Sequence, residues 1–423
     1  MIKKLIKNAS EIEAHEIKST MLSFLLVFVL MLAYYILRPV RDAMASDWSD
    51  AEVSQLWTLN FFISTGLVAL YGIAISKVRF KLLVPGVYLF FAVSFILFYF
   101  IMISITDRTL VDKSFYVWIS VFAMFHLSVF WSFMSDLFNK DQARRIFASI
   151  ATGASAGALI GPLIPTLFAR FSGTDNLVLI AAVILLIPIP LILYLSKLKK
   201  TDLKNEDETT DTSKFKIGGN PFAGFKSFVT NPYLLAIGIF ILLYTMISTF
   251  VYFEQKNLLA DYDRATRTQI LGSIDWIVNV LTFGIAFFAT SRIVKKLGMG
   301  YTLALMPLLV CVGILVLAFA PIIVVLLALQ VARKAGNYAV TKPAREMLFT
   351  EVDKETRYKA KPVIDVVVYR GGDTVTAWIF TGLTEGLGLG FATVGVIGGV
   401  IAAVWAGVGV YLGKMYKRKK TAV

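Results

Sequence analysis

Twelve apolar stretches, each long enough to cross a membrane, constrain the fold of this chain more than any other feature. A helix rises about 1.5 Å per residue, so about 20 apolar residues cross the roughly 30 Å hydrocarbon core of a bilayer. Backbone groups in lipid must be satisfied within the protein, so the stretches predict an all-α integral membrane fold with twelve transmembrane helices. The stretches lie at 21–42, 54–76, 82–104, 115–138, 147–169, 177–197, 233–253, 270–292, 299–318, 321–341, 362–384 and 390–413.

The composition fits a protein that lies almost entirely in a bilayer. Of 423 residues, 57% are hydrophobic and 17% are charged, which excludes a soluble protein with a single anchor. The net charge of +14 requires no nucleic-acid partner, because the basic residues cluster between the apolar stretches, where membrane topology accounts for them. We therefore expect a lipid bilayer, and no nucleic acid, around this protein.

The sequence contains no pattern typical of catalysis or metal binding. It holds two histidines, His15 and His126, and one cysteine, Cys311, and no Gly-rich phosphate loop follows a predicted strand. We therefore expect no catalytic residue, no metal site and no cofactor, and we do not expect an enzyme.

The basic residues also predict the orientation of the chain. Most of them lie at the termini and in the loops after even-numbered stretches, as in cytoplasmic segments. No cleavable signal is recognised, so we expect insertion into a bacterial inner (plasma) membrane with both termini cytoplasmic. Two six-helix halves joined by a cytoplasmic linker are typical of major-facilitator-type transporters. The predicted segments are the cytoplasmic N-terminal segment 1–20, the N-terminal six-helix bundle 21–198, the cytoplasmic linker 199–230, the C-terminal six-helix bundle 231–414 and the cytoplasmic tail 415–423.

The first apolar stretch ends in the segment Tyr34-Tyr35-Ile36-Leu37-Arg38-Pro39-Val40-Arg41-Asp42. Arg38, Arg41 and Asp42 are three and four residues apart, so they share one helix face. A charge at the centre of a membrane helix costs roughly 2.5–3.5 kcal/mol, so such groups face a partner or water. Two guanidinium groups on one face indicate an anionic ligand. The alternative is that both arginines extend to the lipid headgroups while Asp42 pairs with Arg38.

Other polar residues fall inside later stretches. They are Glu254 at the end of the seventh stretch, Asp275 and Asn279 on one face of the eighth, and Asp365 and Arg370 in the eleventh. Because of their depth, we expect a functional or interdomain ion-pair role for the charged members of this set.

Two further charged regions allow a purely structural interpretation. We expect Arg333 and Lys334 to end the tenth stretch, and the charges between 341 and 361 could belong to a cytoplasmic loop with internal ion pairs. By the same argument, Asp136 would pair with Arg144 or Arg145.

Two sets of glycines predict close helix contacts or hinges. Small residues at four-residue spacing allow helices to approach each other closely. The fifth stretch carries Gly153, Gly157 and Gly161, and the eleventh stretch and its exit carry Gly382, Gly386 and Gly390.

Three motifs spread over nearly the whole chain share their order with a known family. The third is the most specific, because its length and order are hard to meet by chance. The motifs are Tyr35-Ile36-Leu37-Arg38-x-x-Arg41-Asp42, then Val129-Phe130-Trp131-Ser132-Phe133 with Asp141-x-Ala143-Arg144-Arg145, and then Pro343-Ala344-Arg345-Glu346-Met347 through Asp353-x-x-Thr356-Arg357-x-Lys359-x-Lys361-x-x-Ile364-Asp365-Val366-Val367. Through them the chain resembles the ATP:ADP antiporter family, the nucleotide transporters of plastids and of obligate intracellular bacteria.

This resemblance implies a twelve-span, major-facilitator-like fold that exchanges phosphorylated nucleosides across the membrane. The family's functional basic residue in the first span falls on Arg41, where the nucleotide carriers typically have Lys. Its acidic residue at the end of the seventh span falls on Glu254, and its basic residue before the eleventh span falls on Lys361. The segment Trp118-Ile119-Ser120 stands where the family has an acidic residue early in the fourth span.

Together, the charged residues and the resemblance predict a carrier of a small organic anion, most directly ATP or ADP, exchanged by alternating access. The guanidinium group of Arg and the ammonium group of Lys both bind phosphate groups. We also expect a monomer. The expected substrate-binding residues are Arg38, Arg41, Tyr35, Glu254, Lys361 and Arg370, and the expected coupling or gating residues are Asp42, Asp275, Asn279 and Asp365.

Two other functions stay open at this stage. A proton-coupled carrier of a different small solute would use Glu254, Asp275 or Asp365 as the group that titrates. A non-transporting membrane protein, such as a scaffold or a sensor, is disfavoured by the many charges inside the spans.

Overall fold

The structure of the chain is a computed structural model, and it describes residues 12–77, 80–203, 223–288, 290–353, 356, 360, 361 and 363–421. Most of the predicted segments 1–20 and 199–230 therefore lie outside the described residues. The helices of the first half are α2 (Ile17–Met44), α3 (Asp50–Lys77), α4 (Phe80–Ser104), α5 (Thr109–Leu137), α6 (Lys140–Ile160), α7 (Leu163–Ser172), α8 (Thr174–Ile184) and α9 (Pro188–Thr201).

The second half is also helical and contains three π-helical segments. Its helices are α10 (Ala223–Thr230), α11 (Pro232–Leu258), α12 (Arg264–Phe288), α13 (Thr290–Phe319), α14 (Ile323–Gly336), α15 (Lys342–Leu348), α17 (Tyr369–Thr381) and α18 (Phe391–Thr421). Its π-helical segments are η3 (Asn337–Thr341), η5 (Val363–Val368) and η6 (Gly382–Gly386).

The described helices agree with the predicted membrane spans. Ten helical segments are long and apolar enough to cross a membrane. The other two predicted spans coincide with α3 and with the segment formed by η5, α17 and η6. The fifth span is formed by α6 and α7, and the sixth by α8 and α9, with interruptions near Pro162 and Pro188. The all-α integral membrane fold is thus confirmed.

The prediction for the end of the tenth span was wrong. Arg333 and Lys334 do not end this span, because the helix continues through η3 and α15 as far as Leu348. Pro343 does not stop it, because it lies in the first turn of α15, where a missing N–H is tolerated. Arg333 is consequently a buried residue inside the span Ile323–Glu351.

Contacts divide the chain into two compact units. Unit 1 comprises Met1–Met44, Phe62–Lys216 and Asp263–Trp276, and unit 2 comprises Ala45–Phe61, Ile217–Tyr262 and Ile277–Val423. Each unit therefore contains most of one half of the sequence and a short segment from the other half. The predicted segment boundaries at 198 and 231 stay a prediction.

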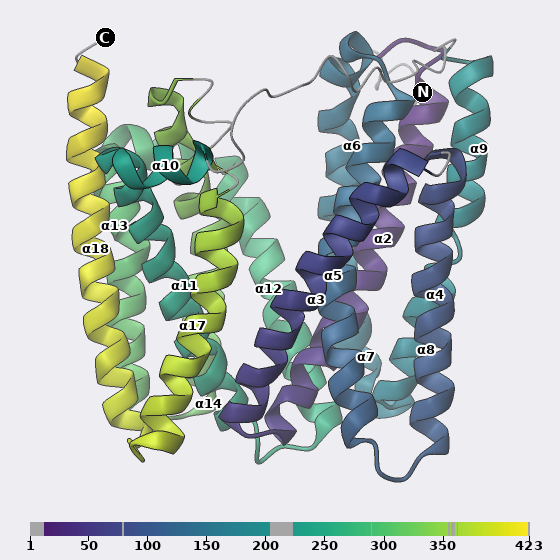
Figure 1. Cartoon of the computed structure of the whole chain (residues 1–423). Helices are drawn as coiled ribbons and strands as arrows, with labels where there is room; N and C mark the ends of the chain where they lie inside the picture. The colour runs from purple at the N-terminus through teal and green to yellow at the C-terminus, as the bar shows by residue number, and fades with distance from the viewer. Residues whose placement is uncertain are drawn as a thin grey trace. The chain divides into compact units, whose positions relative to one another are not determined.

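Unit 1 is organised around α2, which packs against α5, α6, α8 and α9 (Figure 1). The face of α6 toward α2 carries Gly153, Gly157 and Gly161, and a Cβ atom on any of them would come within 3.0 Å of an α2 atom. The predicted close helix contact is confirmed for these three glycines. Gly382, Gly386 and Gly390 make no such contact, because nothing lies within 4 Å of a Cβ built there, and for them the hinge stays a prediction.

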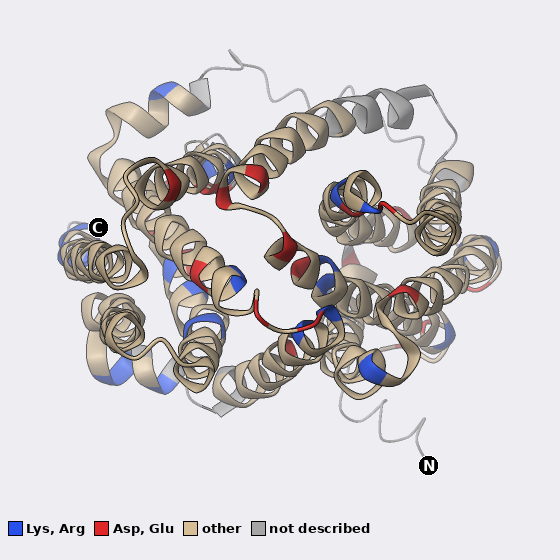
Figure 2. Ribbon diagram, turned by 90° about the horizontal axis from the view of Figure 1, so that it is seen from below, with Lys and Arg blue, Asp and Glu red and all other residues tan. Residues whose placement is uncertain are grey.

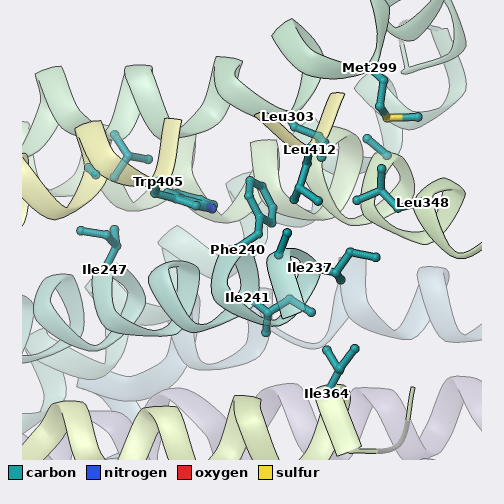
Figure 3. Packing of buried hydrophobic residues seen from close by; sticks show 14 of the residues in the cluster. Ile237, Phe240, Ile241, Ile247, Met299, Leu303, Leu348, Ile364, Trp405 and Leu412 are labelled. Carbon is teal, nitrogen blue, oxygen red and sulfur yellow. The ribbon is translucent and has the colours of Figure 1, made fainter. Parts of the chain in front are cut away.

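The core of unit 2 lies where α11 and α13 pack against α18. Trp405 of α18 contacts Phe240 of α11, with ring centroids 5.5 Å apart, and Ile237 and Leu412 lie near them (Figure 3). All four side chains are essentially buried, as expected for the inward faces of membrane helices that pack against each other.

Charged residues occupy a small part of the helices (Figure 2).

Asp263 lies just before α12 and caps its start. Its carboxylate accepts a hydrogen bond from the hydroxyl of Thr266 and another, at 3.0 Å, from the backbone N–H of Thr266. These two bonds lower the pKa of Asp263, with the hydroxyl as the larger cause. The carboxylate thereby satisfies a backbone donor at the start of α12.

A glycine substitution tests the close contact of α2 and α6. We expect Gly157→Ala to lower the free energy of unfolding by about 1–3 kcal/mol, because the added methyl group has no room beside the Phe28 carbonyl. The measurement is the thermal unfolding midpoint of the purified protein. Gly66→Ala in α3 is the matched control, because nothing lies within 4 Å of a Cβ atom there. Equal midpoints for the two variants would contradict the packing.

Candidate functional site

The predicted pair of arginines lies in the last turns of α2 in unit 1. Arg41 is bound to its neighbour Asp42, with Nη2 and Nε at 2.6 and 2.9 Å from Oδ1. Arg38 lies 3.9 Å from Asp42 Oδ2, and its Nη1 lies 3.5 Å from Asp275 Oδ2 on α12. Four predicted residues from two distant parts of the sequence therefore form one ion-pair cluster.

Neutral side chains complete this cluster. The guanidinium of Arg41 donates to Ser120 Oγ at 3.2 Å, and its central carbon lies 5.5 Å from the centre of the Tyr116 ring. The guanidinium of Arg38 lies 5.9 Å from the centre of the Tyr35 ring. Ser120 belongs to the segment Trp118-Ile119-Ser120, which stands where the family has an acidic residue, and its hydroxyl contacts Arg41.

The cluster is balanced in charge, with two arginines and two aspartates. The side chains of Arg38 and Arg41 are 17% and 16% exposed, and those of Asp42 and Asp275 are 10% and 5% exposed. Arginines that extended to the headgroups would be more exposed, so the structure favours an ion-pair cluster over that alternative. Asn279, the other predicted residue of α12, is half-buried one turn after Asp275.

A second predicted group surrounds Lys361 in unit 2. Lys361 Nζ lies 2.5 Å from Glu346, whose other oxygen is 2.8 Å from Arg345. Arg345 also lies 3.6 Å from Asp365. Lys361 and Asp365 are thus brought into one network, and Lys361 is bound to a carboxylate.

Glu254 is not part of either cluster. It is 5% exposed on α11, and its Oε2 has no hydrogen-bond partner among the described residues. It lines a small cavity whose other walls are apolar; they are formed by Phe250, Val251, Ile314, Leu317, Ala318, Phe391 and Gly395. This predicted residue therefore stands apart as a buried carboxyl group without a cation beside it.

Arg370 differs from the other predicted cations because it is exposed. It lies at the start of α17, and no carboxylate of the described part of the chain lies within 4.0 Å of its guanidinium. Asp373, one turn later, accepts a hydrogen bond from Thr249 at 3.4 Å and interacts electrostatically with both Arg370 and Arg333.

Sequence reasoning missed several buried polar residues. Lys256 Nζ lies 2.8 Å from Asp50 Oδ1 and 2.6 Å from the Trp48 carbonyl oxygen, and both side chains of the pair are about 95% buried (4% and 5% exposed). In unit 1, Asp112 lies 2.8 Å from Arg264 and 3.4 Å from Arg108. The pairs of Lys256 with Asp50 and of Arg264 with Asp112 join segments far apart in the sequence, so local spacing gives no signal for them.

One alternative pairing was wrong. Asp136 lies 3.1 Å from Lys199, whereas Arg145 lies 2.5 Å from Glu16. Within the described ranges, no group of three His, Cys, Asp or Glu side chains is arranged to hold a metal ion.

Comparison with known proteins identifies the family. The profile of the Major Facilitator Superfamily matches residues 23–344. The chain belongs to the major facilitator superfamily. It is therefore a multi-pass membrane transporter of the secondary type, and this membership indicates transport rather than catalysis.

Two solved transporters share the superfamily fold. A bacterial homologue of the human lysosomal transporter Spinster, in an inward-facing and unoccupied conformation, matches with a TM-score of 0.63 and 11% identity over 96% of this chain and 99% of that chain. The nucleoside transporter NupG matches with a TM-score of 0.64 and 15% identity over 95% of this chain and 99% of that chain. At these identities the likeness shows the fold alone. No curated protein matches the chain significantly.

A double-mutant cycle tests the cluster at the end of α2 in this superfamily member. We expect Asp275→Asn to lower the free energy of unfolding by about 2–4 kcal/mol, because it leaves Arg38 without one of its two carboxylates. In the double variant with Arg38→Gln, the second substitution should restore about 1–3 kcal/mol of that loss. Thermal or denaturant unfolding measures both values. Strictly additive effects would mean that the two residues do not form a pair.

Proposed function

We propose that this superfamily member is a secondary active transporter of an organic anion, and that it exchanges ATP and ADP or a related nucleotide pair by alternating access. One observation carries the proposal. Arg370 lies in the eleventh predicted span, about 10 Å from the first described residue of η5 at 1.5 Å per residue, and its exposed guanidinium has no carboxylate within 4.0 Å in the described part of the chain. A cation at that depth needs water or an anion.

The other predicted cations support the proposal less directly. Arg38, Arg41 and Lys361 are bound to carboxylates in this structure, so an anion would have to exchange with these carboxylates. Arg38 also lies beside the ring of Tyr35, and stacked aromatic and guanidinium groups are surfaces on which a nucleobase can lie. We propose these residues, with Glu254, as substrate-binding positions, and Asp42, Asp275, Asn279 and Asp365 as coupling or gating positions.

The nucleotide is the finer part of the proposal and rests on the family resemblance, in which functional residues fall on Arg41, Glu254 and Lys361. One structural neighbour is a nucleoside transporter, but at 15% identity it supports the fold and not the substrate. We also propose a monomer in a bacterial inner membrane, with both termini cytoplasmic, because most of the basic residues lie in the segments predicted to be cytoplasmic.

Ligand-dependent thermal stability tests the proposal. The purified protein is heated with ATP, ADP, sugar phosphates, carboxylates and amino acids. A ligand at 100 times its Kd stabilises the folded state by about 2.7 kcal/mol. We expect a nucleotide to raise the midpoint and Arg370→Gln to abolish the increase. Arg292→Gln, which removes an exposed arginine elsewhere, is the matched control and should retain it. An unfolding midpoint that no anion raises would contradict the proposal.

Glu254 favours a second candidate function, a proton-coupled carrier of a different small solute. A buried carboxyl group inside a membrane span, with one oxygen unbonded and apolar walls around it, is a group that can take up and release a proton. The carboxylates of Asp275 and Asp365, in contrast, have arginine partners.

Proteoliposomes distinguish the two candidates. For a proton-coupled carrier, we expect an imposed pH gradient to drive uptake of the stabilising solute into liposomes that contain no internal solute, and Glu254→Gln to abolish that gradient dependence. For an exchanger, uptake requires internal solute and does not follow the gradient. An unchanged response to the gradient in Glu254→Gln would exclude Glu254 as the coupling group.

A further inference from the structure

Arg333 is a buried arginine of unit 2 that lies inside a membrane span. It lies ten residues after Ile323, the first residue of its span, so it sits about 15 Å along the helix, half of the roughly 30 Å hydrocarbon thickness. Its residue exposure is 5%, and within the described chain no carboxylate lies within 4.0 Å of it. A buried cation without a bound carboxylate is costly unless something else balances its charge.

The hydrogen bonds of Arg333 go to neutral oxygens only. Nε and Nη2 donate to Gln330 Oε1 at 3.2 and 2.7 Å, and Nη1 donates to Ser248 Oγ at 2.8 Å. Gln330 is itself held by a hydrogen bond to Gln255. These contacts fix the plane of the guanidinium and use three of its five N–H donors, which leaves one hydrogen on each terminal nitrogen.

Two hydrogens on neighbouring terminal nitrogens match two oxygens of one anion. Guanidinium groups bind carboxylate and phosphate in this bidentate manner. Asn337, one turn after Arg333, begins the π-helical segment η3 and donates to the Tyr244 hydroxyl at 3.0 Å. Such π-helical turns are frequent at functional sites. Tyr244 and Ser248 are four residues apart on α11, so the polar groups around Arg333 share one helix face.

Arg333 shares a carboxylate with a second arginine. Asp373 interacts electrostatically with both Arg333 and Arg370, and it hydrogen-bonds to Thr249. One carboxylate thus serves two guanidinium groups. At Arg38 and at Lys361, in contrast, each arginine or lysine of the cluster lies within 4.0 Å of a carboxylate.

We infer that Arg333, oriented by Gln330 and Ser248, is a binding subsite for the oxyanion group of the transported solute, a phosphate or a carboxylate. The inference rests on the proposed function and deepens it, because it adds a buried arginine to the substrate site that no motif indicated. The excess charge of this region is then neutralised when the solute binds.

The competing interpretation is that Arg333 only connects α14 to α11, and the two interpretations predict opposite effects of its removal. If Arg333 is an anion-binding residue, Arg333→Gln should leave the ligand-free unfolding midpoint unchanged or raise it, because the substitution removes a buried charge. If Arg333 is structural, the ligand-free midpoint should fall.

The experiment titrates ATP, inorganic phosphate and citrate against the purified full-length protein and follows the unfolding midpoint. The anion that stabilises the wild type is then titrated against Arg333→Gln, Arg333→Lys, Arg370→Gln and the control Arg292→Gln. We expect the anion no longer to raise the midpoint of Arg333→Gln. We expect Arg333→Lys to bind the anion about tenfold more weakly, because Lys keeps the positive charge but cannot form the two parallel hydrogen bonds of a guanidinium. A response to citrate but not to the phosphates would assign a carboxylate, and the reverse a phosphate.

The possible failures are distinguishable. Wild-type stabilisation that is lost in Arg370→Gln but fully kept in Arg333→Gln would overturn the subsite while the proposed function stands. A fall in the ligand-free midpoint of Arg333→Gln with an unchanged Kd would likewise assign it a structural role. If Arg333→Gln does not fold, an unchanged Kd in Arg333→Lys overturns the inference. No stabilisation of the wild type by any probe would contradict both the proposed function and the subsite.

Discussion

A buried cation in a membrane protein needs a carboxylate, an anionic ligand or water, and this requirement accounts for the buried ion pairs of the described chain. The pairs of Lys256 with Asp50 and of Arg264 with Asp112 meet it with carboxylates from distant segments. Because removing one partner from a buried pair leaves an uncompensated charge, these contacts restrict which helix ends can lie together within each unit. Apolar packing alone, as between α13 and α18, places no such restriction.

The same requirement separates structural charges from candidate functional ones. The cations around Arg38 and around Lys361 each lie within 4.0 Å of a carboxylate, whereas Arg333 and Arg370 share an electrostatic interaction with Asp373. Glu254 is the opposite case, a buried carboxyl group in an apolar cavity. Unit 2 therefore holds the two features on which the candidate functions rest, two arginines that share a carboxylate and a separate carboxyl group in an apolar cavity.

The sequence predicted the helices well, because apolar length and backbone chemistry determine a membrane span almost without tertiary information. It also identified Arg38, Arg41, Asp42 and Asp275 as candidate site residues, and these four form one ion-pair cluster. It placed Arg333 at the end of its span, because the charged segment that follows was interpreted as a loop. In the structure the helix continues through this segment, with a π-helical turn at Asn337 and with Pro343 at a position where proline is tolerated. Pairs such as Lys256 with Asp50 depend on the packing of distant helices, and one sequence carries no local signal for them.

Exchange in proteoliposomes tests the central claim, that unbalanced arginines of unit 2 bind a transported anion, most directly. Vesicles loaded with ADP are given labelled ATP outside. The account predicts saturable uptake that requires internal nucleotide and falls at least about tenfold in Arg370→Gln, as expected for loss of a charge-assisted contact, while Arg292→Gln behaves as the wild type. Uptake that is identical in the wild type and in Arg370→Gln would contradict the account.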